Sequence, residues 1–287
     1  MKLLTVQMIK YLVIGDPVAH SRSPKMQNAA FESCGMGSPY GIRHVKSEEL
    51  PEFFEYARTH LAGVNLTVPH KLRAAELADT LTLRAKQCKS VNTLIIKEGL
   101  ITGDSTDGVG LERALMHNFD LPVKGKSFLF AGAGGAARAT AIHFACAGAK
   151  RIMFLNRTAS KAFEIIEDID NLQTGCFCGF TAPGDLAAEL KNTDCIIQAT
   201  SLGLKEDDPA PFDLSLLEAD MQLVIFDTIY KNTKLLQKAA ELGIPCAGGK
   251  EMLIQQGAES FRLWTGMEPD LDAMRAGFEL PPGGVEA

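Results

Sequence analysis

Short apolar runs alternate with stretches of helical periodicity along the first hundred residues. The apolar runs predict strands at 10–15, 41–45 and 63–67, and the periodic stretches predict helices at 23–34, 50–60 and 71–78. Segments 91–97 and 100–102 predict a hairpin that turns at Glu98-Gly99. Strands that alternate with helices favour a mostly parallel sheet covered by helices.

The alternation continues through the rest of the chain. Predicted strands lie at 127–131, 151–155, 176–180, 195–199 and 223–227, and predicted helices lie at 136–148, from 158 to 169, near Leu186 and at 233–242. After Pro245 the pattern changes to two helices, 251–264 and 271–277, and a tail from Pro281 that is expected to fray. The predicted fold class is α/β with two domains, the first mostly parallel and the second of the Rossmann type.

The turn after the strand at 127–131 has the composition of a phosphate-binding turn. Gly132-Ala133-Gly134-Gly135-Ala136-Ala137 is the G-x-G-x-x-A form of the dinucleotide fingerprint. Gly132 permits the tight turn, Gly134 allows the backbone to approach a pyrophosphate, and Ala137 allows close packing of helix on strand. The following helix directs its first N–H groups at an anion. The pattern predicts dinucleotide binding; the alternative is a glycine-rich turn that binds nothing.

The residues after the second strand indicate which dinucleotide is bound. NAD-binding versions of the fold carry an acidic residue there, about 20 residues past the glycines, and none stands at that place. Asn156-Arg157-Thr158 and Lys161 stand there instead, and two cations suit a 2′-phosphate. The prediction is NADP. The alternative is a solvated helix start capped by Thr158 or Ser160.

Composition and charge exclude several classes of protein. With 46% apolar and 22% charged residues in 287, the chain is expected to be soluble and globular, and a net charge of -6 gives no electrostatic reason to expect nucleic acid or a membrane surface as partner. Neither a signal peptide nor an apolar run of about 18 residues is evident. Seven scattered cysteines favour reduced thiols in the cytoplasm, and the C-x-C pair Cys176 and Cys178 lacks a second ligand pair, so no metal site is predicted.

Polar side chains follow the predicted strands of the first hundred residues. They are Ser21 and Ser23, then Asn65, Thr67 and Lys71, then Asn92 and Thr93, and finally Thr106 and Asp107. In an open α/β sheet ligands bind at the carboxyl ends of strands, so these groups can converge on one small, hydroxyl-rich substrate. Taken singly, each has a structural alternative as a helix cap, a turn residue or a solvated lysine.

Eight ordered segments resemble the shikimate dehydrogenase family over nearly the whole chain. They are GDPVAHSRSPKMQNAAF, GVNLTVPHK, SVNT, GDSTDGVG, GAGGAARA, NRT, QATSLG and KEMLIQQGAESFRLWTG. The resemblance implies NADP-linked interconversion of 3-dehydroshikimate and shikimate, a step toward the aromatic amino acids. It further implies a substrate domain over 1–107, completed by C-terminal helices at 248–287, and an NADP-binding domain over 108–247.

By motif position, the resemblance assigns residues to roles. It implies that Lys71 and Asp107 form the catalytic pair and that the substrate is held by Ser21, Ser23, Asn65, Thr67, Asn92, Asp107, Tyr230 and Gln256. With the glycine turn, it implies cofactor contacts by Gly132, Ala133, Gly134, Gly135, Ala136, Asn156, Arg157, Thr158, Lys161, Thr200 and Gly249.

Four positions depart from the family's usual pattern. Ser105 and Gln198 each replace an Asn, Gln27 replaces a His, and Ser90 replaces an Ala. These departures leave three alternatives open: a quinate dehydrogenase, an aminoshikimate dehydrogenase, and a non-catalytic NADP-binding module. Retention of Lys71 and Asp107 favours an enzyme. A monomer and a homodimer are both compatible with the sequence.

Overall fold

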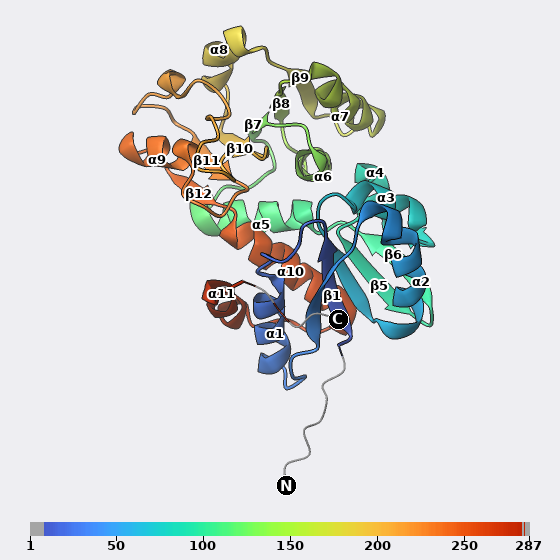
Figure 1. Ribbon diagram of the computed structural model, residues 1–287. Helices are drawn as coiled ribbons and strands as arrows, with labels where there is room; N and C mark the ends of the chain where they lie inside the picture. The colour runs from blue at the N-terminus through green and yellow to red at the C-terminus, as the bar shows by residue number, and fades with distance from the viewer. Residues whose placement is uncertain (1–8, 283, 285–287) are drawn as a thin grey trace. The chain divides into compact units, whose positions relative to one another are not determined.

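Two six-stranded sheets organise the chain, each in its own structural unit (Figure 1). The computed structural model describes residues 9–282 and 284. One unit holds the described residues up to Thr106 and those from Leu253 on, and the other holds Asp107–Met252. Residues 1–8, screened above for a targeting signal, and most of the predicted frayed tail lie outside the described residues.

The sheet of the first unit has the strand order β2-β1-β3-β5-β6-β4. Its strands are β1 (Tyr11–Gly15), β2 (Tyr40–His44), β3 (Gly63–Leu66), β4 (Thr80–Leu81), β5 (Thr93–Lys97) and β6 (Leu100–Asp104). The pairs β1–β2, β1–β3 and β4–β6 are parallel, whereas β5 is antiparallel to both β3 and β6. The carboxyl ends of β1, β3 and β6 and the amino end of β5 therefore lie at one edge of this sheet.

Helices cover both faces of this sheet. α2 (Leu50–His60), α3 (Lys71–Leu77) and α4 (Leu83–Cys88) pack with one core, and α1 (Ser23–Ser33), α10 (Lys250–Thr265) and α11 (Leu271–Glu279) pack with the other. Successive residues of β1 alternate between the two cores: Leu12 and Ile14 join the first, and Tyr11 and Val13 join the second. Burial on both faces explains why this strand is apolar throughout.

The sheet of the second unit is parallel throughout, in the order β12-β11-β10-β7-β8-β9. Its strands are β7 (Ser127–Ala131), β8 (Arg151–Leu155), β9 (Phe177–Phe180), β10 (Cys195–Gln198), β11 (Val224–Asp227) and β12 (Cys246–Gly248). The helices of the second unit are α5 (Asp107–Phe119), α6 (Gly135–Cys146), α7 (Ala159–Asn171), α8 (Leu186–Leu190) and α9 (Lys234–Glu241). Short 3₁₀ turns lie at Ser47–Glu49 in the first unit and at Pro183–Asp185 and Leu214–Leu216 in the second. The strand order reverses at β7, which pairs with β10 on one side and β8 on the other. Such a switch point is where open α/β sheets bind ligands.

The predicted α/β fold class is confirmed, and the predicted bounds of α2, β7 and β8 match the structure. The hairpin turns as predicted, since Glu98 and Gly99 have φ of 52° and 78°. Four elements were not predicted: β4, α4, α5 and β12. The sequence does not predict α5 because Gly108 and Gly110 lower its helix propensity. Gly108 is required by packing, since a Cβ there would lie 2.3 Å from Cβ of His143 on α6.

Candidate active site

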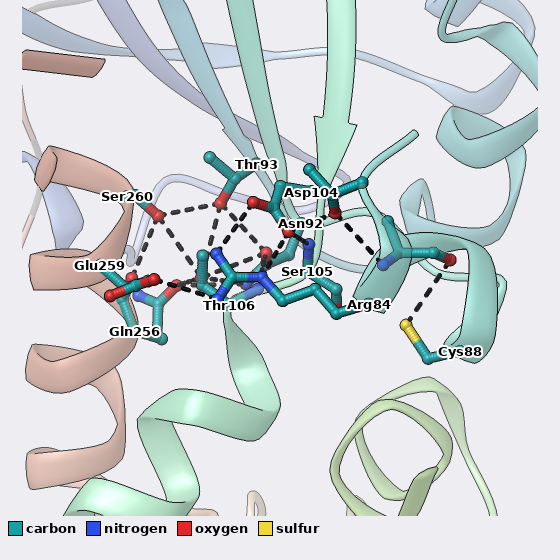
Figure 2. Close-up of polar contacts among 12 residues, drawn as sticks. Arg84, Cys88, Asn92, Thr93, Asp104, Ser105, Thr106, Gln256, Glu259 and Ser260 are labelled. Atoms are coloured by element: carbon teal, nitrogen blue, oxygen red, sulfur yellow. Dashed lines mark hydrogen bonds and ion pairs between the residues drawn. The ribbon is translucent and has the colours of Figure 1, made fainter. Parts of the chain in front are cut away.

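Amide and hydroxyl groups meet around Asn92 at the edge of the first sheet (Figure 2). Asn92 Nδ2 donates to Gln256 Oε1 at 3.2 Å and to Thr106 Oγ1 at 3.0 Å, and Asn92 Oδ1 accepts from the Thr106 N–H at 2.8 Å. All three side chains are buried. Gln256 lies on α10, 164 residues from Asn92. The structure therefore brings together two predicted substrate residues from distant parts of the sequence.

The same cluster extends to a third predicted residue, Asn65. Asn65 Nδ2 donates to Ser260 Oγ at 2.9 Å, and Asn65 Oδ1 accepts from the hydroxyl of the fully buried Tyr40 at 2.8 Å. Thr93 Oγ1 lies 2.9 Å from Ser260 Oγ. We call Asn65, Asn92, Thr93, Thr106, Gln256 and Ser260 the amide–hydroxyl cluster. Ser260 was not predicted from the sequence, although its position one helical turn after Gln256 places it on the same face of α10.

The remaining predicted residues of the first unit lie on neighbouring loops and helix starts. Ser21 Oγ accepts the Ser23 N–H at 3.2 Å at the beginning of α1, so Ser21 shapes this turn. The Thr67 N–H donates to the Ile14 carbonyl at 3.0 Å, which continues the β1–β3 pairing past the strand end. Lys71 is the first residue of α3, and its carbonyl accepts the N–H of Val91 at 2.9 Å. The Lys71 backbone is therefore fixed next to the segment that carries Asn92.

Asp107, the other predicted catalytic residue, is the first residue of α5 and is buried. It directly follows Thr106 of the cluster. The pairing of its carboxylate with Lys71 stays a prediction.

An arginine and two carboxylates lie beside the cluster (Figure 2). Arg84 of α4 donates from Nε to Asp104 Oδ1 at 2.6 Å and from Nη2 to Asp104 Oδ2 at 2.8 Å, and its Nη1 reaches Glu259 Oε1 at 3.0 Å. Burial by itself would lower the pKa of Arg84, but the hydrogen bonds and charges of both carboxylates outweigh it, so that this pKa is raised. The guanidinium is therefore charged at neutral pH.

Three of the four departures from the family pattern leave a buried polar atom without a partner. Among the described residues, Gln27 Oε1, Ser90 Oγ and Ser105 Oγ have no hydrogen-bond partner. Gln27 Nε2 donates to the Gly257 carbonyl of α10 at 2.9 Å. The fourth departure, Gln198, is satisfied, since its Oε1 accepts the Thr200 N–H at 2.6 Å and its Nε2 donates to the Leu202 carbonyl at 2.8 Å. Gln198 thus holds the loop after β10.

The glycine turn after β7 has the geometry of a phosphate-binding turn. Gly132 has φ of 118°, and a Cβ there would lie 2.8 Å from the Ala199 carbonyl carbon, so no other residue fits. A Cβ on Gly134 or Gly135 would meet open space, so both positions are accessible to a ligand. Ala137 is fully buried, as close packing of α6 requires. The donor N–H groups at the start of α6 and the missing side chains fit a pyrophosphate.

Two cations follow β8. Arg157 and Lys161 are both exposed, and the turn between them is held by Asn156 Nδ2, which donates to the Thr158 carbonyl at 2.8 Å. The Lys161 N–H donates to the same carbonyl at 3.2 Å. The turn is therefore ordered by Asn156 and leaves the arginine and the lysine side chains in solvent, where they can meet a phosphate.

The loops after β10, β11 and β12 carry the other predicted residues of the second unit. The Thr228 N–H donates to the Gln198 carbonyl at 2.9 Å and so joins the two strand ends. Directly after β12, Gly249 is required, because a Cβ at this position would lie 2.1 Å from the Thr228 carbonyl oxygen. Tyr230 is 44% exposed. Because β11, β10, β7 and β8 are parallel neighbours, Tyr230, Thr200, the glycine turn and Arg157 lie at one edge of this sheet.

A buried carboxylate shapes the loop that carries Tyr230. Asp227, the last residue of β11, has 0% exposure, and its two oxygens accept the Ile229 N–H at 2.9 Å and the Thr233 hydroxyl at 2.7 Å. Burial raises the pKa of Asp227 to about 6, although both hydrogen bonds act to lower it.

Among the described residues, no group of three or more His, Cys, Asp or Glu side chains is placed to hold a metal ion, and no helix is long and apolar enough to cross a membrane. All seven cysteines, each in the described part of the chain, are free thiols.

Three family profiles match successive parts of the chain. "Shikimate dehydrogenase substrate binding domain" matches residues 13–94, "Shikimate / quinate 5-dehydrogenase" matches 114–205, and "Shikimate 5'-dehydrogenase C-terminal domain" matches 249–276.

Individual proteins match over most of their length. The shikimate dehydrogenase (NADP(+)) of Geobacter sp. (strain M21) is 37% identical over 262 residues, which are 90% of each chain. The crystal structure of shikimate dehydrogenase from Aquifex aeolicus superposes with a TM-score of 0.87 at 34% identity, covering 97% of this chain and 100% of that one. The Thermus thermophilus enzyme, solved in complex with NADP(H) and shikimate, has a TM-score of 0.83 at 32% identity, covering 94% of this chain and 98% of that one.

Proposed function

Because the chain belongs to the shikimate dehydrogenase family, we propose that it is an NADP-dependent shikimate dehydrogenase, which interconverts shikimate and 3-dehydroshikimate by reversible hydride transfer. The observation that carries the proposal is the amide–hydroxyl cluster. It places donors and acceptors from β3, β5, the end of β6 and α10 within hydrogen-bond distance of one another. Such groups suit a substrate that presents several hydroxyls and a carboxylate.

The first unit is assigned to the substrate. Asn65, Asn92 and Gln256 would bind the ring hydroxyls, and Ser21, Ser23 and Thr67 would complete the contacts to hydroxyls and carboxylate. Tyr230, a residue of the second unit, is assigned to the substrate carboxylate. Tyr40 and Ser260 hold Asn65 in place by the hydrogen bonds described above. Because the side-chain amides are fixed before substrate arrives, little rotamer entropy remains to be lost on binding.

The second unit is assigned to NADP. Gly132, Gly134 and the start of α6 would shape the glycine turn around the pyrophosphate. Ala133, Gly135 and Ala136 are their neighbours in the turn. Asn156, Arg157, Thr158 and Lys161 would hold the 2′-phosphate, and Thr200 and Gly249 would contact the rest of the cofactor. When bound, NADP supplies the hydride acceptor for the oxidation.

Lys71 and Asp107 are assigned to proton transfer. As shikimate is oxidised, the hydroxyl that loses its hydrogen must also lose a proton, and Lys71 Nζ would accept it as general base. In the reduction Lys71 would return the proton to the same oxygen. Asp107 would orient the Lys71 ammonium and stabilise its charge. General acid–base catalysis of this kind contributes about 10²–10⁴ in rate.

Seven thiols without disulfides favour a reducing compartment, and we assign the enzyme to the cytoplasm.

The test is a substrate screen of the purified protein, followed at the absorbance band of the reduced nicotinamide. Shikimate, quinate and aminoshikimate are each assayed with NADP and with NAD. The highest kcat/KM is expected for shikimate with NADP. A higher kcat/KM for quinate or aminoshikimate would identify that compound as the substrate in place of shikimate. If none of the three compounds reduced the cofactor, the result would favour a binding module that lacks catalysis.

A further inference from the structure

Arg84 connects the two chain segments that supply Thr106, Gln256 and Ser260 of the amide–hydroxyl cluster (Figure 2). Its Nε and Nη2 bind both oxygens of Asp104, the last residue of β6, and its Nη1 binds Glu259 of α10, 175 residues away in sequence. We call these three residues the Arg84 bridge.

Asp104 anchors the segment that carries Thr106. Its Oδ1 accepts the Ser105 N–H at 2.7 Å and the Thr82 hydroxyl at 2.7 Å, and its backbone carbonyl accepts the Asn92 N–H at 3.0 Å. The Asp104 side chain is only 2% exposed, so its charge depends on these donors and on Arg84. The Asp104 carboxylate therefore fixes the turn into Thr106, and the Asp104 backbone carbonyl fixes the backbone of Asn92.

Glu259 joins α10 to Arg84. It lies on α10 between Gln256 and Ser260, and 14% of its side chain is exposed. Gln256 and Ser260 reach Asn92, Thr93 and Asn65 only while α10 keeps its position along this edge of the sheet. The guanidinium of Arg84 binds Asp104 and Glu259 with donors that are held in one plane. It therefore fixes the position of α10 more closely than the ammonium of a lysine would.

We propose that Arg84 is a positioning residue for substrate binding: through Asp104 and Glu259 it holds the Asp104–Thr106 segment and α10 at the spacing at which Asn92, Thr106 and Gln256 can bind the substrate together. This inference rests on the proposed function, because it takes the amide–hydroxyl cluster as the substrate site. Arg84 itself is not required to touch the substrate.

The same unit contains a matched control. Arg58 of α2 binds both oxygens of Asp79, at 2.5 Å and 2.9 Å, and Asp79 Oδ2 accepts the backbone N–H of Ile101 at 2.8 Å. Like Asp104, Asp79 pairs with an arginine through both oxygens and accepts one backbone N–H. Asp79 meets the Ile101 end of β6, whereas Asp104 meets the end that leads to Thr106. Loss of either arginine removes a bidentate ion pair. Of these two pairs, Arg84–Asp104 adjoins the amide–hydroxyl cluster and Arg58–Asp79 does not.

The experiment compares Arg84→Gln and Arg58→Gln with the wild type, at a temperature at which circular dichroism shows all three folded. Arg84→Gln is expected to raise KM for shikimate about tenfold or more, with KM for NADP changed less than about twofold and a smaller fall in kcat, because ground-state binding is lost. Arg58→Gln is expected to leave both KM values unchanged. Arg84→Lys, which keeps the charge without the fork, should give an intermediate KM for shikimate.

Hydrogen exchange supplies a second readout that does not depend on activity. In Arg84→Gln the backbone amides of 104–106 and 253–265 are expected to exchange faster than in Arg58→Gln. An unchanged KM for shikimate together with unchanged exchange in these segments would overturn the inference, and so would equal rises in both KM values. If Arg84→Gln does not fold, Glu259→Gln removes only the α10 arm, and an unchanged KM for shikimate in that variant would overturn it as well. A wild type inactive on shikimate would contradict the proposed function, and the exchange data would then decide the positioning role alone.

Discussion

Replacement of Asp227 by Asn should change how the stability of the protein depends on pH. Asp227 is fully buried at the end of β11, and its oxygens accept hydrogen bonds from the Ile229 backbone and the Thr233 hydroxyl. Asn has nearly the same shape, its oxygen can accept the Ile229 N–H, and its amide can donate to Thr233. The variant therefore removes the titrating carboxyl while most of the local packing is kept.

The direction of the effect follows from the pKa of Asp227, which burial raises from an ordinary value of 3.8 to about 6. Because the folded state favours the protonated form, the stabilisation by this group is fully present below about pH 3.8 and is lost as the pH rises through about 6. Between these values the slope is about 1.4 kcal/mol for each pH unit. From about pH 4.5 to about pH 7.5, the free energy of unfolding of the wild type should fall by about 2 kcal/mol relative to that of Asp227→Asn.

Urea unfolding at a series of pH values measures this difference. Far-UV circular dichroism follows both structural units, whereas Trp264, the single tryptophan, lies in the first unit and Asp227 lies in the second. If the units unfold separately, the pH-dependent difference should appear in the circular dichroism transition of the second unit and not in the tryptophan fluorescence.

A difference between variant and wild type that stays constant over this pH range would refute the reasoning, since Asp227 would then titrate alike in the folded and unfolded states. Asp213→Asn is a control of opposite sign. Hydrogen bonds from the Ser215 side chain and backbone lower the pKa of Asp213, so its stabilisation is present above pH 3.8 and is lost as the pH falls. For that variant, the difference should stay nearly constant from about pH 4.5 to about pH 7.5 and should change, in the opposite direction, only as the pH falls through about 3.8.

Three further predictions concern catalysis and specificity. Lys71→Ala should lower kcat by about 10²-fold or more with little change in KM for shikimate, and near-normal turnover of the folded variant would exclude Lys71 as the general base. Arg157→Ala should reduce the preference for NADP over NAD, measured as a ratio of kcat/KM values, by about 10- to 100-fold, since a charge-assisted contact is worth about 1.5–3 kcal/mol; a wild type that favours NAD would contradict the cofactor assignment. Ser105→Asn should raise kcat/KM for shikimate, because the buried Ser105 hydroxyl has no partner among the described residues; unchanged kinetics would limit this position to shaping the backbone.

Local patterns in the sequence were sufficient for most of the helices and strands and for the glycine turn after β7. β7, the glycine turn, α6 and β8 follow one another within a short stretch, and each is encoded by its own residues, since an apolar run, a φ that only glycine adopts easily and a helical repeat are all local properties. The assignment of Arg157 and Lys161 to the end of β8 was local for the same reason. α5 was missed because its two early glycines, which packing on α6 demands, run against helix propensity.

The amide–hydroxyl cluster could be predicted only in part. Asn65, Asn92 and Gln256 were identified from polar positions and from the resemblance to a family, but Tyr40 and Ser260, the partners of Asn65, were not. Nothing in the neighbouring sequence marks Tyr40, whereas the only local signal for Ser260 is its place one helical turn after Gln256. The four departures show the same limit. The sequence located Gln198 and Ser105, whereas only the structure distinguishes a satisfied amide from a buried hydroxyl without a partner.

The sequence by itself therefore determined the fold class, the order of the elements and the chemistry at each strand end, because these depend on residues a few positions apart. Tertiary structure alone decided which of those ends share a site. The contact of Arg84 with Glu259 spans 175 residues, and it exists only because α10 packs against the same sheet edge that α4 and β6 approach. Packing of distant segments, rather than any local pattern, sets the spacing of the groups in the amide–hydroxyl cluster.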